Sequence, residues 1–407
     1  MDHRVDLKYK NKHFPAPLAP KPAGGSGTQT NPSNASSTVP NTAHHSLEGQ
    51  KLSMKELIAS FSGLVIEPQQ PEIEGDPVPP CPISELPDEI LVHILRDVAI
   101  VDIASFVRLA RVCKRLAYLV ATEDQIWRRV CLGPEFGFGG MHYRWQTSVT
   151  WGPVNVEEDE ASDSGPPGLE ESEEEETPED DQPAATPKLT LKALLRLPSS
   201  QRLALEAAEK TATTLSLLPT PLYKSSWQRM YRLRPRIRFG GCYISTVNYI
   251  RSGQASTNQV TWGSPVHIVT YYRYLRFFRD GTAISLLTTA EPADVVHHVT
   301  KDALALHREG ASSHLPTVVM QNALRGRWKM GTKEKEGELK VETEGVGKYM
   351  YRLDLRFANA GKGVKNGKLV WNGFYSYNRL TDDWSEFGLK NDKPFFFSRV
   401  RSYGLGE

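Results

Sequence analysis

The chain has 407 residues, a formal net charge of +1 and a hydrophobic content of 39%, which allows two or three domains with at least one good core. It has no uninterrupted apolar run of about 18 residues, so no transmembrane helix is predicted, and its amino terminus lacks the apolar region of a signal peptide. The four cysteines form no CxxC pair, which argues against a zinc site and a disulfide scaffold and predicts a cytoplasmic or nuclear protein.

The amino-terminal part predicts little fixed structure. Residues 1–47 are poor in large apolar side chains and rich in Pro, Ser, Asn, Thr and Gly, so they are expected to be disordered. Residues 48–82 predict a short amphipathic helix and a proline-rich linker. The side chains expected on the apolar side of this helix are Met54, Leu57, Ile58 and Phe61. The helix either docks on a partner or packs on its own chain.

Residues 83–131 predict a compact group of short helices. Pro87 suits a helix start, and Asp88 and Glu89 place negative charge at the positive end of the helix dipole. Apolar side chains then recur at intervals of three and four residues, at Ile90, Leu91, Ile94, Leu95 and Val98. Asp102 can cap a second helix. A chain of roughly fifty residues rarely completes a core alone, so we expect this region to bury its apolar side chains against a partner.

An aromatic and glycine-rich loop at 132–154 leads into an acidic segment at 155–187. From Glu157 to Asp181 there are fourteen carboxylates and no Lys or Arg, so the segment is expected to stay unfolded. Without these charges the net charge of +1 becomes +15, so the folded parts are basic. The segment either screens that basic surface, recruits a basic partner, or is solvated filler. Its hydroxyl groups suit an acid-directed kinase, at Ser162, Ser164, Ser172 and Thr177.

Residues 188–235 predict connecting helices with a break at Pro198, and residues 236–407 predict a β-domain. The latter alternates aromatic and β-branched runs with turn residues, and Asp280-Gly281 is a strong hairpin signal. We expect seven or eight antiparallel strands that form a barrel rather than a sandwich, because closure removes exposed edges. Alternation places Trp328 inside, and Arg327 and Arg352 toward water. Between 291 and 316 we expect a short helix and a mobile loop.

Three sequence blocks follow one another in the helical region, LPDEILVHIL at 86–95, LARVCK at 109–114 and IWR at 126–128. In this order and spacing they resemble an F-box, the motif by which substrate receptors dock on the Skp adaptor of cullin-RING ubiquitin ligases. The residues that this resemblance assigns to the Skp adaptor are Leu86, Pro87, Ile90, Leu91, Ile94, Leu95, Leu109, Val112, Cys113, Leu116 and Trp127.

The order of F-box, acidic loop, helix and aromatic β-domain is similar to that of the F-box only protein nine family, with RPRIRFGGCYIS, YYRYLRFFRDGTAISLLTT and GRW as matching segments. The fold class expected is therefore α+β multidomain: a small all-α F-box followed by a barrel-like antiparallel β-domain. The resemblance implies a non-catalytic substrate-recognition subunit that reaches cullin and a RING subunit through the adaptor. That family commonly has a tetratricopeptide-like region before the F-box, and the first 50 residues here are too polar to predict one.

No residue pattern predicts catalysis, a cofactor or a metal. Cys113 is expected in the apolar stripe as an inert buried thiol, and the adjacent His297 and His298 point in different directions. The alternatives are a β-barrel holding a small apolar ligand among Tyr349, Tyr351, Trp328 and Trp371, for which a barrel filled by these rings is the competitor, and nucleic-acid binding. An adaptor complex acting outside ubiquitination is a further alternative.

Overall fold

The computed structural model describes residues 81–154, 198–252, 266–332, 335–404 and 406, with isolated positions between 56 and 80. The predictions for residues 1–47, for the acidic segment 155–187 and for most of the helix expected at 48–82 lie outside these residues. Within the described part, none of the helices combines the length and the apolar character that crossing a membrane requires.

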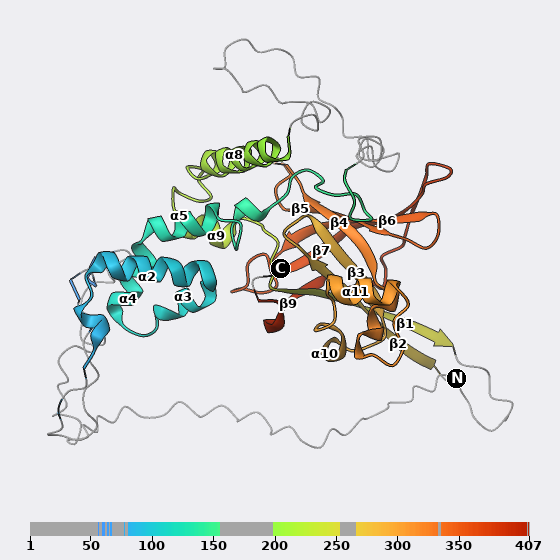
Figure 1. Ribbon diagram of the computed structural model, residues 1–407, viewed down its shortest axis with the longest axis horizontal. Coiled ribbons are helices and arrows are strands. Elements are labelled where there is room, and N and C mark those ends of the chain that lie inside the picture. The colour runs from blue at the N-terminus through green and yellow to red at the C-terminus, as the bar shows by residue number, and fades with distance from the viewer. Residues whose placement is uncertain are drawn as a thin grey trace, which may run out of the picture. The chain divides into compact units, whose positions relative to one another are not determined.

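The first described region is a group of short helices (Figure 1). Its elements are η2 (Pro82–Glu85), α2 (Asp88–Val101), α3 (Ile103–Leu109), α4 (Lys114–Thr122) and α5 (Asp124–Leu132). As predicted, α2 follows Pro87 and has two acidic residues in its first turn. Asp102 caps α3, because its Oδ1 accepts a hydrogen bond of 3.1 Å from the Ala104 N–H.

A later segment of the same chain completes part of the core of this region. Phe106 and Ile126 are fully buried, and so is Met230 of α9 (Trp227–Leu233), which packs in the same cluster. The ring of Trp127 lies between Phe106 at 5.5 Å and Tyr231 of α9 at 5.7 Å, measured between centroids. The apolar side chains of residues 83–131, which were expected to need a partner, are therefore covered in part by α9, about a hundred residues later in the chain.

Two helices and a loop connect the helical region to the strands. The loop contains η3 (Phe138–Gly140), and α8 (Ser199–Leu217) begins directly after Pro198. The helical segment predicted before Pro198 lies outside the described residues. Helix α9 is capped by Ser226, whose Oγ accepts a hydrogen bond from the Arg229 N–H.

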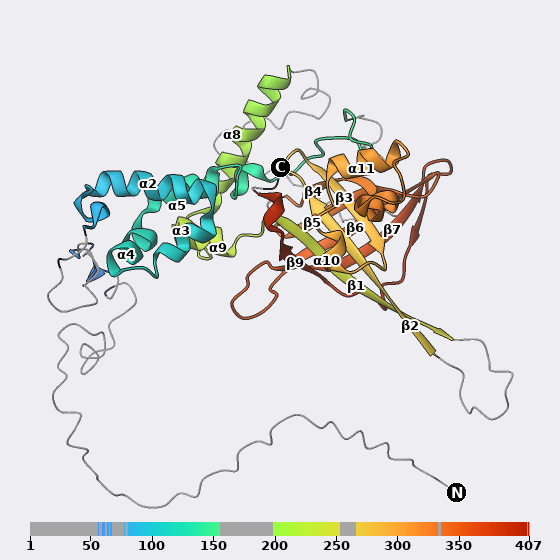
Figure 2. The same cartoon turned by 60° about the horizontal axis from the view of Figure 1, so that its bottom comes forward.

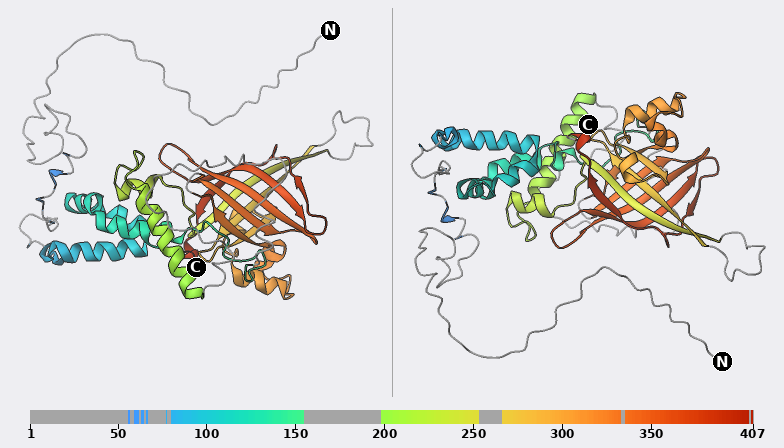
Figure 3. Two further views of the ribbon diagram at one scale, coloured as in Figure 1. Left: turned by 90° about the horizontal axis from the view of Figure 1, so that it is seen from above. Right: turned by 90° about the horizontal axis from the view of Figure 1, so that it is seen from below.

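The strands form one sheet in which every pairing between them is antiparallel, ordered β6-β5-β4-β3-β2-β1-β9-β7-β8. They are β1 (Gly241–Ser252), β2 (Val266–Phe277), β3 (Thr282–Thr288), β4 (Leu324–Met330), β5 (Glu338–Glu344), β6 (Tyr349–Ala358), β7 (Lys368–Asn378), β8 (Asp383–Glu386) and β9 (Phe395–Arg399). Because β6 also pairs with β7, eight strands close into a barrel and β8 adds to one edge of β7 (Figure 3). The predicted antiparallel barrel is confirmed.

The predicted hairpin at Asp280-Gly281 joins β2 and β3. Gly281 has a φ of 86°, a value that favours glycine. Asp280 fixes the turn, since its Oδ1 accepts hydrogen bonds from the backbone N–H of Thr282 at 3.1 Å and from the Thr282 hydroxyl at 2.6 Å. Burial would raise the pKa of Asp280, but the hydrogen bonds from Lys301 and Thr282 lower it below its usual range.

The barrel wall has a core on each side. The inner core includes Tyr243, Leu275, Trp328 and Phe395, all fully buried. The outer core lies beneath α10 (Pro292–Val295), α11 (Lys301–Arg308), η4 (Pro316–Asn322) and η5 (Arg401–Tyr403), and Figure 2 shows the first two helices against the strands. Two short helices therefore occupy the interval for which one helix and a loop were expected.

Two arginines on the outer face of the barrel are buried, which corrects two predictions of side chains facing water. Arg327 is 1% exposed, because its Nη2 pairs with the buried carboxylate of Glu342 at 2.8 Å and its guanidinium stacks on Trp145, 4.3 Å from the ring centroid. Arg352 is also buried, and its Nε donates to Asp354 at 2.9 Å. Alternation gives the correct inner face but cannot reveal that loop and helix segments cover the outer one.

Candidate protein-binding surface

Helix α2 carries a wide apolar arc, of which the chain buries only one side. Leu91 and Leu95 lie in the helical core, each 4% exposed. On the neighbouring side of the same helix, Ile90 and Ile94 are 47% and 43% exposed and lie one turn apart. A helix whose apolar stripe is this wide normally packs all of it against other residues. The exposed side of α2 is therefore a candidate binding surface.

Further exposed apolar side chains occur close to α2 along the chain. Ile83 precedes the helix, Val101 ends it, Val107 belongs to α3, and Val112 lies in the turn before α4. Sequence reasoning did not assign Ile83, Val101 or Val107 to a partner. The sequence could have indicated these three residues, because each is a large apolar side chain that does not fall in the spacing of the buried residues Leu91 and Leu95.

The structure separates the eleven predicted partner-binding residues into three groups. The exposed ones are Pro87, Ile90, Ile94 and Val112, the partly buried ones are Leu86, Leu109 and Cys113, and the core ones are Leu91, Leu95, Leu116 and Trp127. The last group supports the surface from below instead of lying on it. Trp127 shows why: its Nε1–H donates to the Val120 carbonyl at 2.7 Å, so the ring is fixed inside the core.

A pocket of about 280 Å³ lies beside Leu86. Its walls come from η2, the start of α2, Arg115 of α4, and the upstream residues Gly63, Leu64 and Ile66. Ile66 also packs against the helical core. Gly63, Leu64 and Ile66 thus contact the helical region, whereas most of the helix predicted before them lies outside the described residues.

Charged residues fix the ends of α2. Asp88 forms an ion pair with Arg115 of α4. At the other end, Asp102 lies 3.4 Å from the guanidinium of Arg399 on β9. Burial would raise the pKa of Asp102, but hydrogen bonds from Ser105 and Ala104 and the charge of Arg399 lower it. This carboxylate therefore links the helical region to the barrel.

The cysteines fit structural roles in the described chain. Cys113 is partly buried rather than in the core as expected, because its Sγ caps α4 by accepting a hydrogen bond from the Leu116 N–H at 3.5 Å. Cys131 and Cys242 are buried, and burial raises the pKa of each thiol to about 12. Such thiols remain protonated at neutral pH and are poor nucleophiles.

The paired histidines are not brought together with other ligands. The Nδ1 of His297 lies 3.1 Å from the Ser402 hydroxyl. Among the residues that the structure describes, no group of three His, Cys, Asp or Glu side chains is placed to hold a metal ion.

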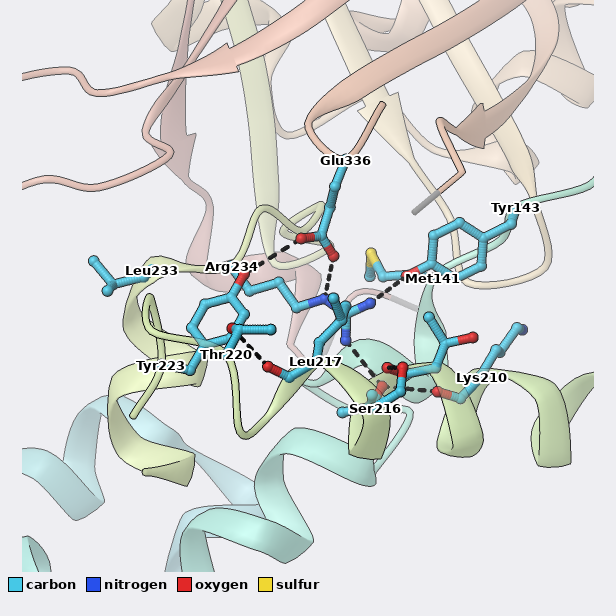
Figure 4. Close-up of polar contacts among 12 residues, drawn as sticks. Met141, Tyr143, Lys210, Ser216, Leu217, Thr220, Tyr223, Leu233, Arg234 and Glu336 are labelled. Carbon is cyan, nitrogen blue, oxygen red and sulfur yellow. Dashed lines mark hydrogen bonds and ion pairs between the residues drawn. The ribbon is translucent and has the colours of Figure 1, made fainter. Parts of the chain in front are cut away.

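A buried arginine joins the helical region to the barrel (Figure 4). Arg234, which follows α9, is 1% exposed, and its Nε pairs with Glu336 in the β4–β5 turn at 2.5 Å. Its Nη1 donates to the Thr214 hydroxyl of α8 at 2.9 Å, and its Nη2 donates to the Tyr143 hydroxyl at 3.0 Å. The guanidinium also stacks over the Phe138 ring at 4.3 Å. One side chain thus connects four segments, and we call this set of contacts the Arg234 joint.

The four aromatic residues proposed for a ligand cavity do not line a common space. Trp328 is fully buried in the inner core, while Tyr351 and Trp371 are partly buried and Tyr349 is exposed at the start of β6. Leucine, valine, methionine and phenylalanine side chains pack around Trp328. The middle of the barrel is therefore filled by side chains.

Comparisons with known proteins match both regions. Residues 83–133 match the F-box-like family model, and residues 218–372 match the model of the F-box only protein C-terminal region. The second match includes α9, Arg234, the strands β1 to β6 and the start of β7. Neither finding depends on the geometry above, yet together they cover the helical region and most of the barrel.

Two curated relatives are also similar. The chain is 35% identical over 182 residues to the F-box protein pof7 of Schizosaccharomyces pombe, a match that covers 44% of this chain and 46% of pof7. It is 33% identical over 191 residues to the F-box protein HRT3 of Saccharomyces cerevisiae, which covers 47% of this chain and 50% of HRT3. The chain thus spans about half the length of the curated relatives it matches. No solved structure matches the chain significantly.

Proposed function

We propose that this chain, which matches an F-box-like domain followed by the F-box only protein C-terminal region, is a substrate-recognition subunit of an SCF-type ubiquitin ligase. The helical region docks on a Skp adaptor, and through it on cullin and a RING subunit. The β-domain holds the protein substrate. The chain itself performs no catalytic step, and it acts in the cytoplasm or nucleus.

The exposed half of the apolar arc on α2 supports adaptor docking most directly. Ile90 and Ile94 present branched side chains to solvent above a core that Leu91 and Leu95 have already completed. Fully burying one isoleucine side chain stabilises a complex by about 1.5–3 kcal/mol. Isolated exposed apolar residues are common, but several on one helix and its neighbouring turns are typical of an interaction surface.

The Arg234 joint supports a role in substrate positioning. A ligase of this type works by holding a substrate lysine near a charged ubiquitin, so that a bimolecular step becomes effectively intramolecular. This requires a defined geometry between the adaptor-binding and substrate-binding parts. Arg234 and the Asp102–Arg399 contact both connect the helical region to the barrel, which fits that requirement.

The test replaces exposed residues without touching the core. Ile90→Asp with Ile94→Asp should reduce the adaptor and cullin recovered with the tagged chain at least tenfold, because two carboxylates would have to be buried in an apolar interface. Leu86→Ala with Pro87→Ala should act in the same direction. The matched control is Leu203→Asp, since Leu203 is an exposed apolar residue of α8, 61% exposed.

The outcomes are distinct. Thermal melting should be unchanged in Ile90→Asp/Ile94→Asp and in Leu203→Asp, whereas Leu86→Ala/Pro87→Ala removes a side chain that packs on the helical core and should melt slightly lower. Substrates captured during proteasome inhibition should remain bound to all variants. Undiminished adaptor recovery with Ile90→Asp/Ile94→Asp would refute the docking surface. Recovery of adaptor without cullin from the unmodified chain would instead support an adaptor complex that acts outside ubiquitination.

A further inference from the structure

One end of the barrel places an arginine among aromatic rings on the inner side of the wall. This end, from which the β1–β2 ribbon extends (Figures 1 and 2), is called here the ribbon end. On β2, Arg273 alternates in phase with Leu275 and Phe277, both of which belong to the inner core. Arg273 pairs in register with Ser245 of β1 and Leu287 of β3. It therefore points into the barrel.

The guanidinium of Arg273 is held in place but its hydrogen bonds are incomplete. Its carbon lies 5.2 Å from the centroid of Trp371 and 4.8 Å from that of Phe374, both on β7. Its Nη2 lies 3.5 Å from Oδ1 of Asp392, a long contact. Its Nε is buried and has no hydrogen-bond partner. A buried donor without a partner destabilises the folded chain, and an incoming acceptor would remove that cost.

Exposure changes sharply along the barrel on either side of Arg273, whose side chain is 13% exposed. On the inner-core side, Leu275, Tyr243 and Phe395 are completely buried. Toward the ribbon end, apolar side chains reach solvent: Tyr271 is 36%, Leu287 46% and Phe387 40% exposed. The first two of these are inward-facing by alternation, and Phe387 stacks on Phe374 with ring centroids 4.5 Å apart. Arg273 thus lies at the floor of an apolar, solvent-accessible rim.

We propose that the ribbon end binds the carboxy-terminal end of a polypeptide, with its terminal carboxylate on Arg273 and an apolar last side chain against the rim. This proposal rests on the proposed function and names the class of substrate that the β-domain takes. A planar guanidinium can bind both oxygens of a carboxylate, and stacking on Trp371 and Phe374 fixes the orientation of the Arg273 guanidinium before a ligand arrives.

Three features favour a chain terminus over other anions. One arginine next to Asp392 suits a monoanion, whereas phosphate groups usually bind clusters of basic residues. The filled barrel beneath Arg273 leaves no length for a long acyl chain. Strands surround the site on the wall side, so a ligand enters along the barrel axis, which a chain end does more easily than an internal segment.

Asp392 provides a distinguishing prediction. Its carboxylate occupies one side of the guanidinium and would compete with a ligand carboxylate. Asp392→Asn should therefore tighten binding several-fold. If the pair were only structural, this change would weaken folding and create no binding.

The experiment uses the full-length chain, immobilised, and two pools of short peptides with varied last three residues, one with free carboxylates and one with terminal amides. The free-carboxylate pool should be retained and enriched in apolar last residues, and the amide pool should not. Arg273→Met/Asp392→Asn, which removes both charges together so that neither stays buried alone, should lower retention at least tenfold. Arg356→Gln is the matched control, because Arg356 is an exposed arginine on the outer side of β6.

Equal retention of the two pools, or retention that does not change with the double variant, would overturn the proposal. So would binding of a fluorescent long-chain fatty acid without binding of either pool, which would make the site a lipid site. Melting of each variant shows that it is folded. Co-purification of the adaptor is measured with the unmodified chain and with the same variants. If the unmodified chain recovers the adaptor but binds no peptide, only this inference is refuted. If the unmodified chain recovers no adaptor, the proposed function is refuted.

Discussion

The Arg234 joint makes a quantitative prediction about how the helical region and the barrel are held together. Arg234→Met keeps the length of the side chain but removes its charge and three hydrogen bonds, to Glu336, Thr214 and Tyr143. Removing one partner of a buried ion pair costs about 3–5 kcal/mol. Because the Glu336 side chain is 17% exposed and can take up water, we expect the lower value, about 3 kcal/mol.

The measurement is a double-mutant cycle with Glu336→Gln, followed by urea denaturation and by hydrogen exchange of α8, α9 and the β4–β5 turn. The double variant should cost less than the sum of the two single variants, with a coupling energy of about 1–3 kcal/mol, since no charge is left alone. Exchange should quicken at the joint more than in the barrel core. Additive single effects, or unchanged exchange at the joint, would show that Arg234 does not hold the two regions together.

Two further predictions concern the barrel. Burial, with the charge of Lys210, lowers the pKa of His142 to about 4. The unfolded chain, with a histidine pKa of about 6.5, then binds more protons between these pH values, so stability falls by up to about 3 kcal/mol on acidification through this window. His142→Gln should reduce that pH dependence in denaturation experiments, and an unchanged slope would contradict it. Gly281→Ala should destabilise the chain by about 1–3 kcal/mol, because its φ is 86° and a Cβ would lie 2.7 Å from Gln146. Gly310→Ala is the control, with a φ of 88° and open space, so equal melting losses would rule out the contact with Gln146 as a cause.

The sequence predicted local features well where the signal was local. Pro87, Asp102 and Gly281 each determine backbone geometry within a few residues, and the structure places a helix start, a cap and a turn there. The period of two in the β-domain likewise gave the antiparallel strands and their inner face. These signals need no knowledge of distant contacts.

What the sequence could not show depends on residues far apart in the chain. Leu91 and Ile90 are equally apolar neighbours, yet only the position of α3, α5 and α9 decides that the first is buried and the second exposed. The burial of Arg327 requires Glu342 and the Trp145 loop. The sequence did not single out Arg273, whose inward position follows from its register with Ser245 of β1 and Leu287 of β3.

The order of the strands also has a consequence for biosynthesis. The barrel closes through β9, which lies between β1 and β7 although it is the last strand to leave the ribosome, and Gly241 pairs with Arg399. Until those final residues emerge, β1 and β7 expose unpaired edges, which other chains can join. Closure through a pairing so distant in sequence is also expected to be slow. A chain that stopped before Phe395 would keep the exposed side of α2 while its barrel stayed open.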